Sequence, residues 1–254
     1  MKKSLPILKK CKQVLPLSSN TPPLLFLHGF MGSPKDWDPF IFPNFSKRCI
    51  TIPGHEFSPL PHQKPLLREL LKIIYKQFNK KKSILIGYSL GGRLAMHFAC
   101  AFPELIDSLI ILSANPGLEC SQQRAIRRKK DEKWADFLLN YGLSSFLKKW
   151  QEQSLFNALP PLSFKRREHH CPNALSRILR ELSPGRLPSL WSRLPHFSFE
   201  TLYLFGENDI DYKKIAKKME GSIAVDMIPK AKHAIHLENP SACIERINQF
   251  IKYR

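Results

Sequence analysis

Short apolar runs alternate along this chain with longer stretches in which apolar residues recur every three or four positions. The short runs have the length and flanking turn residues of buried strands, and the periodic stretches have the spacing of amphipathic helices. The predicted strands are 24–27, 49–52, 83–86, 106–112, 201–205 and 223–228, and the predicted helices are 66–78, 90–102 and a last one beginning at Pro240. Strands that alternate with helices predict an α/β fold, with a mostly parallel central sheet and helices on both faces.

The pattern changes between about residues 115 and 195. This stretch is helical in character and heavily charged, with 15 Lys and Arg against 7 Asp and Glu. Because the strand pattern returns after it, the simplest organisation is one core that is interrupted by an insertion. We therefore expect an α/β core made of 1–114 and 196–254, with a helical cap over 115–195 inserted in it.

The segment Gly87-Tyr88-Ser89-Leu90-Gly91 has the form G-x-S-x-G. It follows a predicted strand and opens a predicted helix, which is the context in which this motif forms a sharp turn that exposes the serine. The amino end of the helix would favour negative charge beside the serine hydroxyl. Ser89 is thus the predicted reactive residue.

A serine hydroxyl needs a base to deprotonate it and an acid to orient that base. With the chain order serine, acid, histidine, Asp209 directly after a predicted strand is the expected acid, and His233 in the loop before the last helix is the expected base. Their local competitors are Asp211 and His236. The spacing after the strands favours Asp209 and His233.

The loop that follows the first strand begins His28-Gly29-Phe30. In this arrangement such a loop supplies one backbone N–H of an oxyanion hole, and the residue after the serine supplies the other. The two donors would be the N–H groups of Phe30 and Leu90. We expect His28 to shape the loop and not to transfer protons.

Taken together, His28-Gly29, the segment 87–91, Asp209 and His233 resemble the α/β-hydrolase superfamily, and the resemblance covers nearly the whole chain. It implies an α/β-hydrolase fold with a helical cap. Esterases, thioesterases, peptidases and lyases all occur in that superfamily, so the resemblance does not by itself fix the reaction.

Arg93 lies four residues after Ser89, on the same face of the predicted helix. A cation beside the positive end of a helix is electrostatically costly, unless the ligand supplies a carboxylate that can pair with the guanidinium. The alternative is that Arg93 turns outward and pairs with a surface acid. The first interpretation predicts an anionic substrate.

Three segments are similar to one lyase family, the 2-succinyl-6-hydroxy-2,4-cyclohexadiene-1-carboxylate (SHCHC) synthases of menaquinone biosynthesis. They are 27–33 with Trp37, Gly87 to Arg93, and the cap segment RRKKDEKWA over 127–135. This resemblance implies a carbon–oxygen lyase that eliminates pyruvate from a succinyl-enolpyruvyl-cyclohexene dicarboxylate to give SHCHC. In that reaction Ser89, deprotonated by His233, would remove a ring proton, and Asp209 would orient His233.

The same resemblance implies how the substrate is held. Arg93, Arg127 and Arg167 would bind its carboxylates, with Arg166 as the neighbouring alternative to Arg167, and the aromatic residues Tyr88 and Trp150 would line the pocket. It implies neither a metal nor an organic cofactor. The rival hypothesis is a serine carboxylesterase or thioesterase that uses the same three catalytic residues on a small ester or acyl thioester. That activity would not require Arg93.

The chain has a formal charge of +19, which admits nucleic acid, a membrane surface or a small anion as a partner. It contains no nucleic-acid-binding motif and no arrangement of aromatic residues as a stacking platform, so we expect a small multicarboxylate substrate and no specific nucleic acid.

No apolar run approaches the roughly 18 residues of a membrane-spanning helix, and we expect no membrane insertion. The six scattered cysteines contain no C-x-x-C pair, which favours a reducing cytoplasm. A monomer or a weak homo-oligomer is expected.

Overall fold

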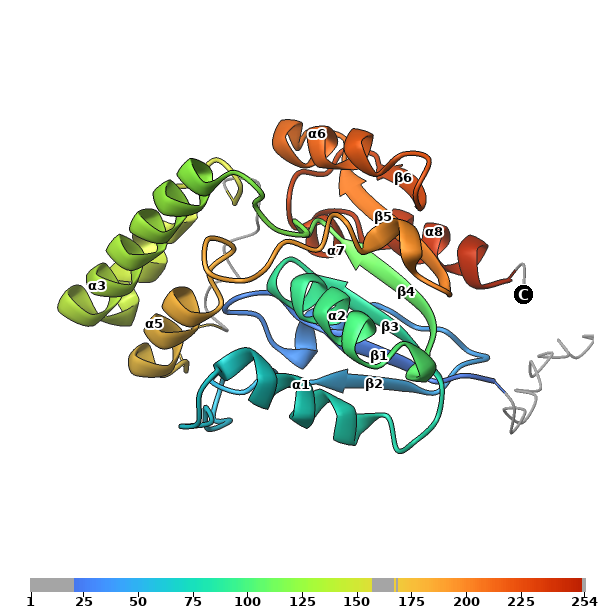
Figure 1. The fold of residues 1–254 in the computed structure, drawn as a ribbon, viewed down its shortest axis with the longest axis horizontal. Coiled ribbons are helices and arrows are strands. Elements are labelled where there is room, and N and C mark those ends of the chain that lie inside the picture. Colours follow the sequence, from blue (N-terminus) through green and yellow to red (C-terminus); the bar gives the residue numbers. More distant parts are fainter. Residues whose placement is uncertain (1–20, 157–166, 168, 253–254) are drawn as a thin grey trace, which may run out of the picture.

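The computed structural model describes residues 21–156, 167 and 169–252. In this part of the chain six strands form one parallel sheet with the order β2-β1-β3-β4-β5-β6 (Figure 1). The strands are β1 (Leu24–Leu27), β2 (Lys47–Ile50), β3 (Ser83–Tyr88), β4 (Ile106–Leu112), β5 (Glu200–Gly206) and β6 (Ala224–Ile228). The order of the strands reverses between β1 and β3. The loops that leave these two strands therefore diverge, and such a switch point is where α/β sheets bind ligands.

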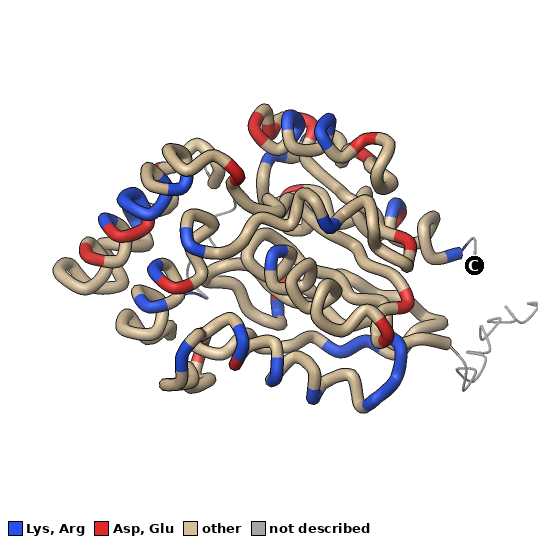
Figure 2. The backbone as a smooth tube through the Cα atoms, in the orientation of Figure 1, with Lys and Arg blue, Asp and Glu red and all other residues tan. Residues whose placement is uncertain are grey.

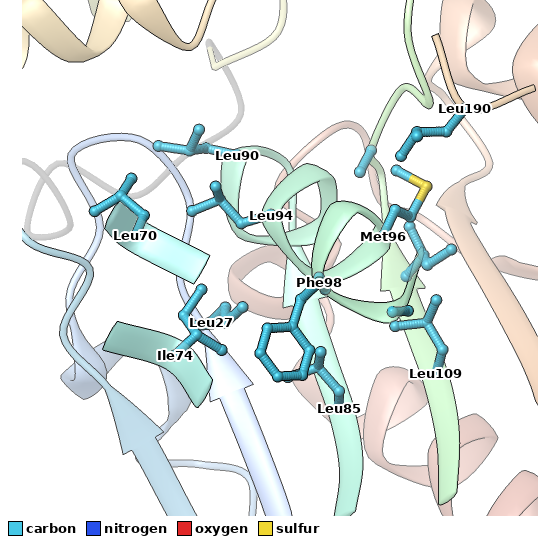
Figure 3. Packing of buried hydrophobic residues seen from close by; sticks show 14 of the residues in the cluster. Leu27, Leu70, Ile74, Leu85, Leu90, Leu94, Met96, Phe98, Leu109 and Leu190 are labelled. Atoms are coloured by element: carbon cyan, nitrogen blue, oxygen red, sulfur yellow. The ribbon is translucent and has the colours of Figure 1, made fainter. Parts of the chain in front are cut away.

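Helices cover both faces of the sheet because the inner strands β1, β3, β4 and β5 bury side chains on both sides. Leu25 and Leu27 of β1 belong to a core cluster with residues of α1 (Leu66–Gln77), α2 (Leu90–Ala101) and α6 (Ile210–Met219). Leu24 and Phe26 belong to a second cluster with residues of α8 (Pro240–Lys252). Figure 3 shows the first of these clusters around α2, with Leu27, Leu85 and Leu109 reaching up from three strands. The other described helices are α3 (Ser121–Gln151), α5 (Pro172–Glu181) and α7 (Ile235–Glu238), with short 3-10 turns η1 (Pro34–Trp37), η2 (Pro103–Leu105) and η3 (Leu194–His196).

The strand predicted at 49–52 lies instead at Lys47–Ile50. Its pairing with β1 ends at Ile50, and the N–H of Ile52 donates to the imidazole of His28 (3.0 Å) instead of to a neighbouring strand. Ile52 is buried and apolar like a strand residue, so the sequence pattern continued beyond the point where the backbone leaves the sheet.

Two helices, α3 and α5, lie together beside the carboxyl edge of the sheet (Figure 1). The 31-residue α3 is broken at Gly142, whose φ of 76° an L side chain rarely adopts. Arg180 of α5 bridges Glu132 and Asp136 of α3, both at 2.6 Å, and fastens the two helices to each other. Within the described part of 115–195, the remaining backbone is mostly turn and loop and not helix.

Arginine side chains also connect these helices to the loops around them through backbone carbonyls. Arg124 donates to the carbonyl of Leu187 (2.8 Å), and Arg128 donates to that of Gly185 (2.9 Å). Figure 2 shows many of the basic residues on α3, on α5 and on α1 with the turn after it. In the described ranges, no helix has both the length and the apolar character needed to cross a membrane.

Candidate active site

The turn between β3 and α2 places Ser89 at the carboxyl edge of the sheet. Ser89 has φ 50° and ψ −108°, and its N–H donates to the carbonyl of Leu112 (2.9 Å) at the end of the next strand. A Cβ atom on Gly91 would lie 2.4 Å from the carbonyl oxygens of Leu27 and His28. Only glycine permits this approach, so the second glycine of the motif lets α2 start against the loop that leaves β1.

Ser89, His233 and Asp209 form one hydrogen-bonded chain. Nε2 of His233 lies 3.2 Å from Oγ of Ser89, and Nδ1 lies 3.2 Å from Oδ2 of Asp209. The three residues follow β3, β6 and β5, whose carboxyl ends meet at the same edge. Because the Asp209 carboxylate accepts the Nδ1 proton, Nε2 has a lone pair for the serine proton. The arrangement can deprotonate Ser89.

Asp209 has a second structural role at the start of α6. Its Oδ1 accepts the N–H of Tyr212 (3.2 Å), so the same carboxylate caps the helix and orients His233. The competing residues lie elsewhere. His236 packs its ring against Tyr88 and Trp37, with centroids 4.1 and 4.8 Å away, and Asp211 pairs with a lysine of its own helix.

The loop after β1 makes a tight turn in which the N–H of Gly32 donates to the carbonyl of Gly29 (3.0 Å). His28 holds this turn from the core side. Its Nδ1–H donates to the same carbonyl (2.8 Å), and its Nε2 accepts the N–H of Ile52. Phe30, in the middle of the turn, and Leu90, after the serine, both line the cavity in front of Ser89.

That cavity collects the residues singled out from the sequence. Ser89 and His233 lie in its wall, whereas Asp209 lies behind His233 and does not line it. The other predicted residues that line the cavity are Phe30, Tyr88, Leu90, Arg93, Arg127, Trp150 and Arg167. Arg166, the alternative to Arg167, lies outside the described residues.

Arg93 faces the cavity and does not turn outward to a surface acid. Its Nη1 donates to the carbonyl of Leu182 (2.6 Å), and no carboxylate among the described residues lies within ion-pair distance of its guanidinium. Burial, and secondly the positive charge of Arg127, lower the pKa of Arg93 to about 10. It therefore remains a cation at neutral pH, half-buried beside Ser89, in a place where an anionic group would be strongly stabilised.

Arg127 reaches the same cavity from α3. Its Nε lies 2.9 Å from both carboxylate oxygens of Asp131, one helical turn later, and the side chain of Asp131 is 5% exposed. This contact fixes the guanidinium and uses only its Nε–H. Arg167 is also largely buried. Burial is the main cause of the lowered pKa of His236 and His170, and the charge of Arg167 lowers both further. The cavity wall thus carries three arginines from separate parts of the chain.

Two aromatic residues of the cavity were not singled out as site residues from the sequence. The ring of Tyr212 lies 4.5 Å from that of His233, and Trp134 packs edge-on against Trp150 at 5.0 Å. Burial raises the pKa of Tyr212, while Arg127 and Arg93 act in the opposite direction. Its position three residues after Asp209, in the first turn of α6, was the available signal. Trp150 in turn stacks on Phe156 (5.8 Å), which makes this wall aromatic.

We expect the protein to lose stability as the pH falls below about 6.5. Burial, the largest cause, lowers the pKa of His28 to about 3 in the folded protein, so the unfolded chain binds a proton that the folded one refuses. The contribution of His28 to the free energy of unfolding is therefore fully present above its unfolded pKa near 6.5. Between that pH and about pH 3 this contribution decreases by about 1.4 kcal/mol for each pH unit. Urea unfolding at several pH values should show a shallower decline in His28→Gln than in the wild type, and an unchanged decline in the exposed-site control His62→Ala.

In the described residues, no cluster of three or more histidine, cysteine, aspartate or glutamate side chains could hold a metal ion. The cavity itself is lined by Ser89, His233, the arginines and the aromatic wall.

Comparison with known proteins agrees with this geometry. A family model described as the alpha/beta hydrolase fold matches residues 22–168. The SHCHC synthase of Salmonella arizonae is 32% identical over 94% of this chain and 98% of its own length. The chloroplastic protein PHYLLO of Arabidopsis thaliana is 31% identical over 89% of this chain, which spans only 15% of PHYLLO.

The structure of MenH from S. aureus superposes on this fold with a TM-score of 0.86 and 28% identity, covering 91% of this chain and 94% of that one. The fold, the full-length match to a synthase and the cavity lined by arginines in front of Ser89 all support the same family assignment. The chain therefore belongs to the α/β-hydrolase fold family and, within it, to the family of the SHCHC synthases.

Proposed function

We propose that this enzyme is a carbon–oxygen lyase that eliminates pyruvate from a succinyl-enolpyruvyl-cyclohexene dicarboxylate and forms SHCHC in menaquinone biosynthesis. The observation that carries the proposal is the placement of Arg93, Arg127 and Arg167 around a cavity that also contains Ser89 and His233. The full-length similarity to SHCHC synthases supports the same reaction.

The reaction begins with proton transfer. His233 takes the hydroxyl proton of Ser89, and the resulting alkoxide removes a proton from the substrate ring. The electron pair of the broken C–H bond forms a ring double bond, the electrons shift through the ring, and the C–O bond to the enolpyruvyl group breaks. The departing enolate becomes pyruvate by taking up a proton. Asp209 stabilises His233 while it is charged.

Negative charge develops on the succinyl carbonyl as the ring proton leaves. We assign its stabilisation to the N–H groups of Phe30 and Leu90, which line the cavity, in the same way as an oxyanion hole stabilises a tetrahedral intermediate. General-base catalysis supplies roughly 10²- to 10⁴-fold of the acceleration. Orientation of the substrate by the arginines and stabilisation of the developing charge would supply much of the rest.

The substrate fits the charges and surfaces of the cavity. It carries several carboxylates, and a guanidinium binds a carboxylate through two parallel hydrogen bonds. Arg93 lies closest in sequence to Ser89, Arg127 approaches from α3, and the aromatic wall around Trp150 offers flat apolar surface to a six-membered ring. An esterase that acts on small neutral esters would have no use for this positive wall.

We also propose that the enzyme works in the cytoplasm on this small anionic substrate, without a cofactor, as a monomer or a weak homo-oligomer. All the described cysteines are free thiols, as is usual in a reducing compartment.

The direct test is release of pyruvate from the authentic substrate, followed through the reduced nicotinamide that lactate dehydrogenase consumes. We expect turnover that depends on enzyme concentration, with formation of the SHCHC chromophore at the same rate. The matched assay uses p-nitrophenyl acetate and an acyl thioester. Rapid ester or thioester hydrolysis without release of pyruvate would instead identify a serine hydrolase and overturn the proposal.

A further inference from the structure

One histidine joins the segment before α5 to two loops of the core. His170 is 4% exposed, and both its ring nitrogens are hydrogen-bonded to backbone groups far away in the sequence. Its Nε2–H donates to the carbonyl of Met31 (2.9 Å), and its Nδ1 accepts the N–H of Glu56 (2.7 Å). The imidazole therefore bridges the turn that contains Phe30 and the loop that follows β2.

Both residues held by this ring have left-handed backbones. Met31 has φ 58° and Glu56 has φ 50°, although neither is glycine. Such conformations cost about 1–3 kcal/mol each and persist only where the surroundings hold them, commonly at functional sites. Met31 directly follows Phe30 within the turn that Gly29 and Gly32 close. The bond from His170 thus acts on the backbone next to the proposed oxyanion donor.

Only one protonation state of His170 makes both bonds, because the ring must donate at Nε2 and accept at Nδ1. Burial and the charge of Arg167 lower its pKa, which favours this neutral form. The ring also packs edge-on against His55 at 5.4 Å, and His55 packs against His28 at 4.9 Å. His28 and His170 therefore each hydrogen-bond a carbonyl of the same turn, and the ring of His55 packs against both of them.

The segment that carries His170 also carries Arg167, which lines the cavity three residues earlier. The bond from His170 to the Met31 carbonyl thus lies close in sequence to an arginine of the cavity wall. This placement distinguishes His170 from an ordinary buried histidine of the core.

We propose that His170 is a positioning residue that fixes the Met31 carbonyl and thereby aims the Phe30 N–H at the charge that develops on the substrate. It touches neither the substrate nor Ser89. The inference rests on the proposed function for the reaction concerned, but it also holds for any reaction that uses Ser89 and the Phe30 N–H.

Two amide substitutions distinguish the contributions of the two hydrogen bonds that the imidazole of His170 makes. In His170→Gln the side-chain amide nitrogen can occupy the place of Nε2 and keep the bond to Met31. In His170→Asn the amide oxygen can occupy the place of Nδ1 and keep only the bond to Glu56. His170→Ala removes both bonds, and His169→Ala, an exposed neighbour, is the matched control.

The measurements are kcat and KM for pyruvate release, the rate at which a fluorophosphonate labels Ser89, and Tm. We expect His170→Ala and His170→Asn to lower kcat and the labelling rate by about 10- to 100-fold, since an oxyanion donor contributes about 10²- to 10³-fold. His170→Gln should stay within about 3-fold of the wild type, and His169→Ala should not change either rate.

Equal losses in the Gln and Asn variants, or losses in all three that follow the decrease in Tm, would show a purely structural role and overturn the proposal. Unchanged labelling of His170→Ala would overturn it as well. Because the fluorophosphonate reacts with any serine activated in this way, labelling tests His170 even if the wild type releases no pyruvate. A wild type that releases no pyruvate would overturn the proposed function and leave the proposal about His170 intact.

Discussion

Replacement of Ser89 by alanine should lower kcat for pyruvate release by at least about 10³-fold. The change removes the hydroxyl that lies 3.2 Å from Nε2 of His233, and with it the group that takes the ring proton. General-base catalysis of this kind contributes up to about 10⁴-fold, and the members of a catalytic triad act as a unit. Steady-state kinetics on the authentic substrate measures the loss, and KM should change little because the arginines remain.

The matched control for this change is Ser113→Ala. Ser113 follows β4 as Ser89 follows β3, it also has a positive φ (44°), and its buried hydroxyl has no hydrogen-bond partner in the described structure. Because it does not line the cavity, this variant should keep wild-type kcat. If Ser89→Ala retained more than about a tenth of wild-type kcat, His233 itself or another group would have to be the base.

Replacement of Arg93 by alanine should lower kcat/KM for the multicarboxylate substrate by about 10²-fold or more. Truncating one partner of a desolvated charge pair costs roughly 2–5 kcal/mol, and Arg93 is held half-buried beside Ser89 with no carboxylate of the described chain to neutralise it. Hydrolysis of a small neutral ester, or labelling of Ser89 by a fluorophosphonate, should change less than about 3-fold. Both assays use the same purified variant.

The Arg93→Lys variant distinguishes the contribution of the positive charge from that of the guanidinium geometry. A lysine keeps the positive charge but lacks the planar fork that binds a carboxylate through two bonds, so it should recover only part of the lost kcat/KM. If Arg93→Ala impaired the neutral ester as strongly as the multicarboxylate, the bond to the Leu182 carbonyl would be its main contribution, and Arg93 would be structural.

The sequence was most informative where backbone geometry demands a particular residue. Gly91 can be nothing larger against the carbonyls of Leu27 and His28, so the strand, the turn and the helix around Ser89 were predictable together. Asp209 and His233 were predictable because parallel strands bring their carboxyl ends to one edge. The strand at Lys47–Ile50 was predicted two residues too late, because buried apolar residues continue beyond the last residue that pairs with β1.

The parts of the site that depend on contacts between distant segments were less accessible. Arg93 could be placed on the face of Ser89 by helical spacing, whereas its bond to Leu182 joins residues 89 positions apart. His170 stood in a charged stretch with no motif, and its two backbone partners lie 139 and 114 positions away. Helical periodicity also gave no sign that α3 breaks at Gly142.

The arginines that hold α3 and the segment 182–187 in place over the cavity have a consequence for how the enzyme responds to ionic strength. Arg93, Arg124 and Arg128 donate to neutral carbonyl groups and not to carboxylates in these part-buried contacts. Mobile ions weaken such contacts much less than they weaken exposed pairs of opposite charge. These three contacts should therefore persist in concentrated salt, whereas the exposed ion pairs of Arg180 with Glu132 and Asp136 should weaken. Capture of a multiply charged substrate would weaken under the same conditions, so salt would raise KM well before it loosened these three contacts.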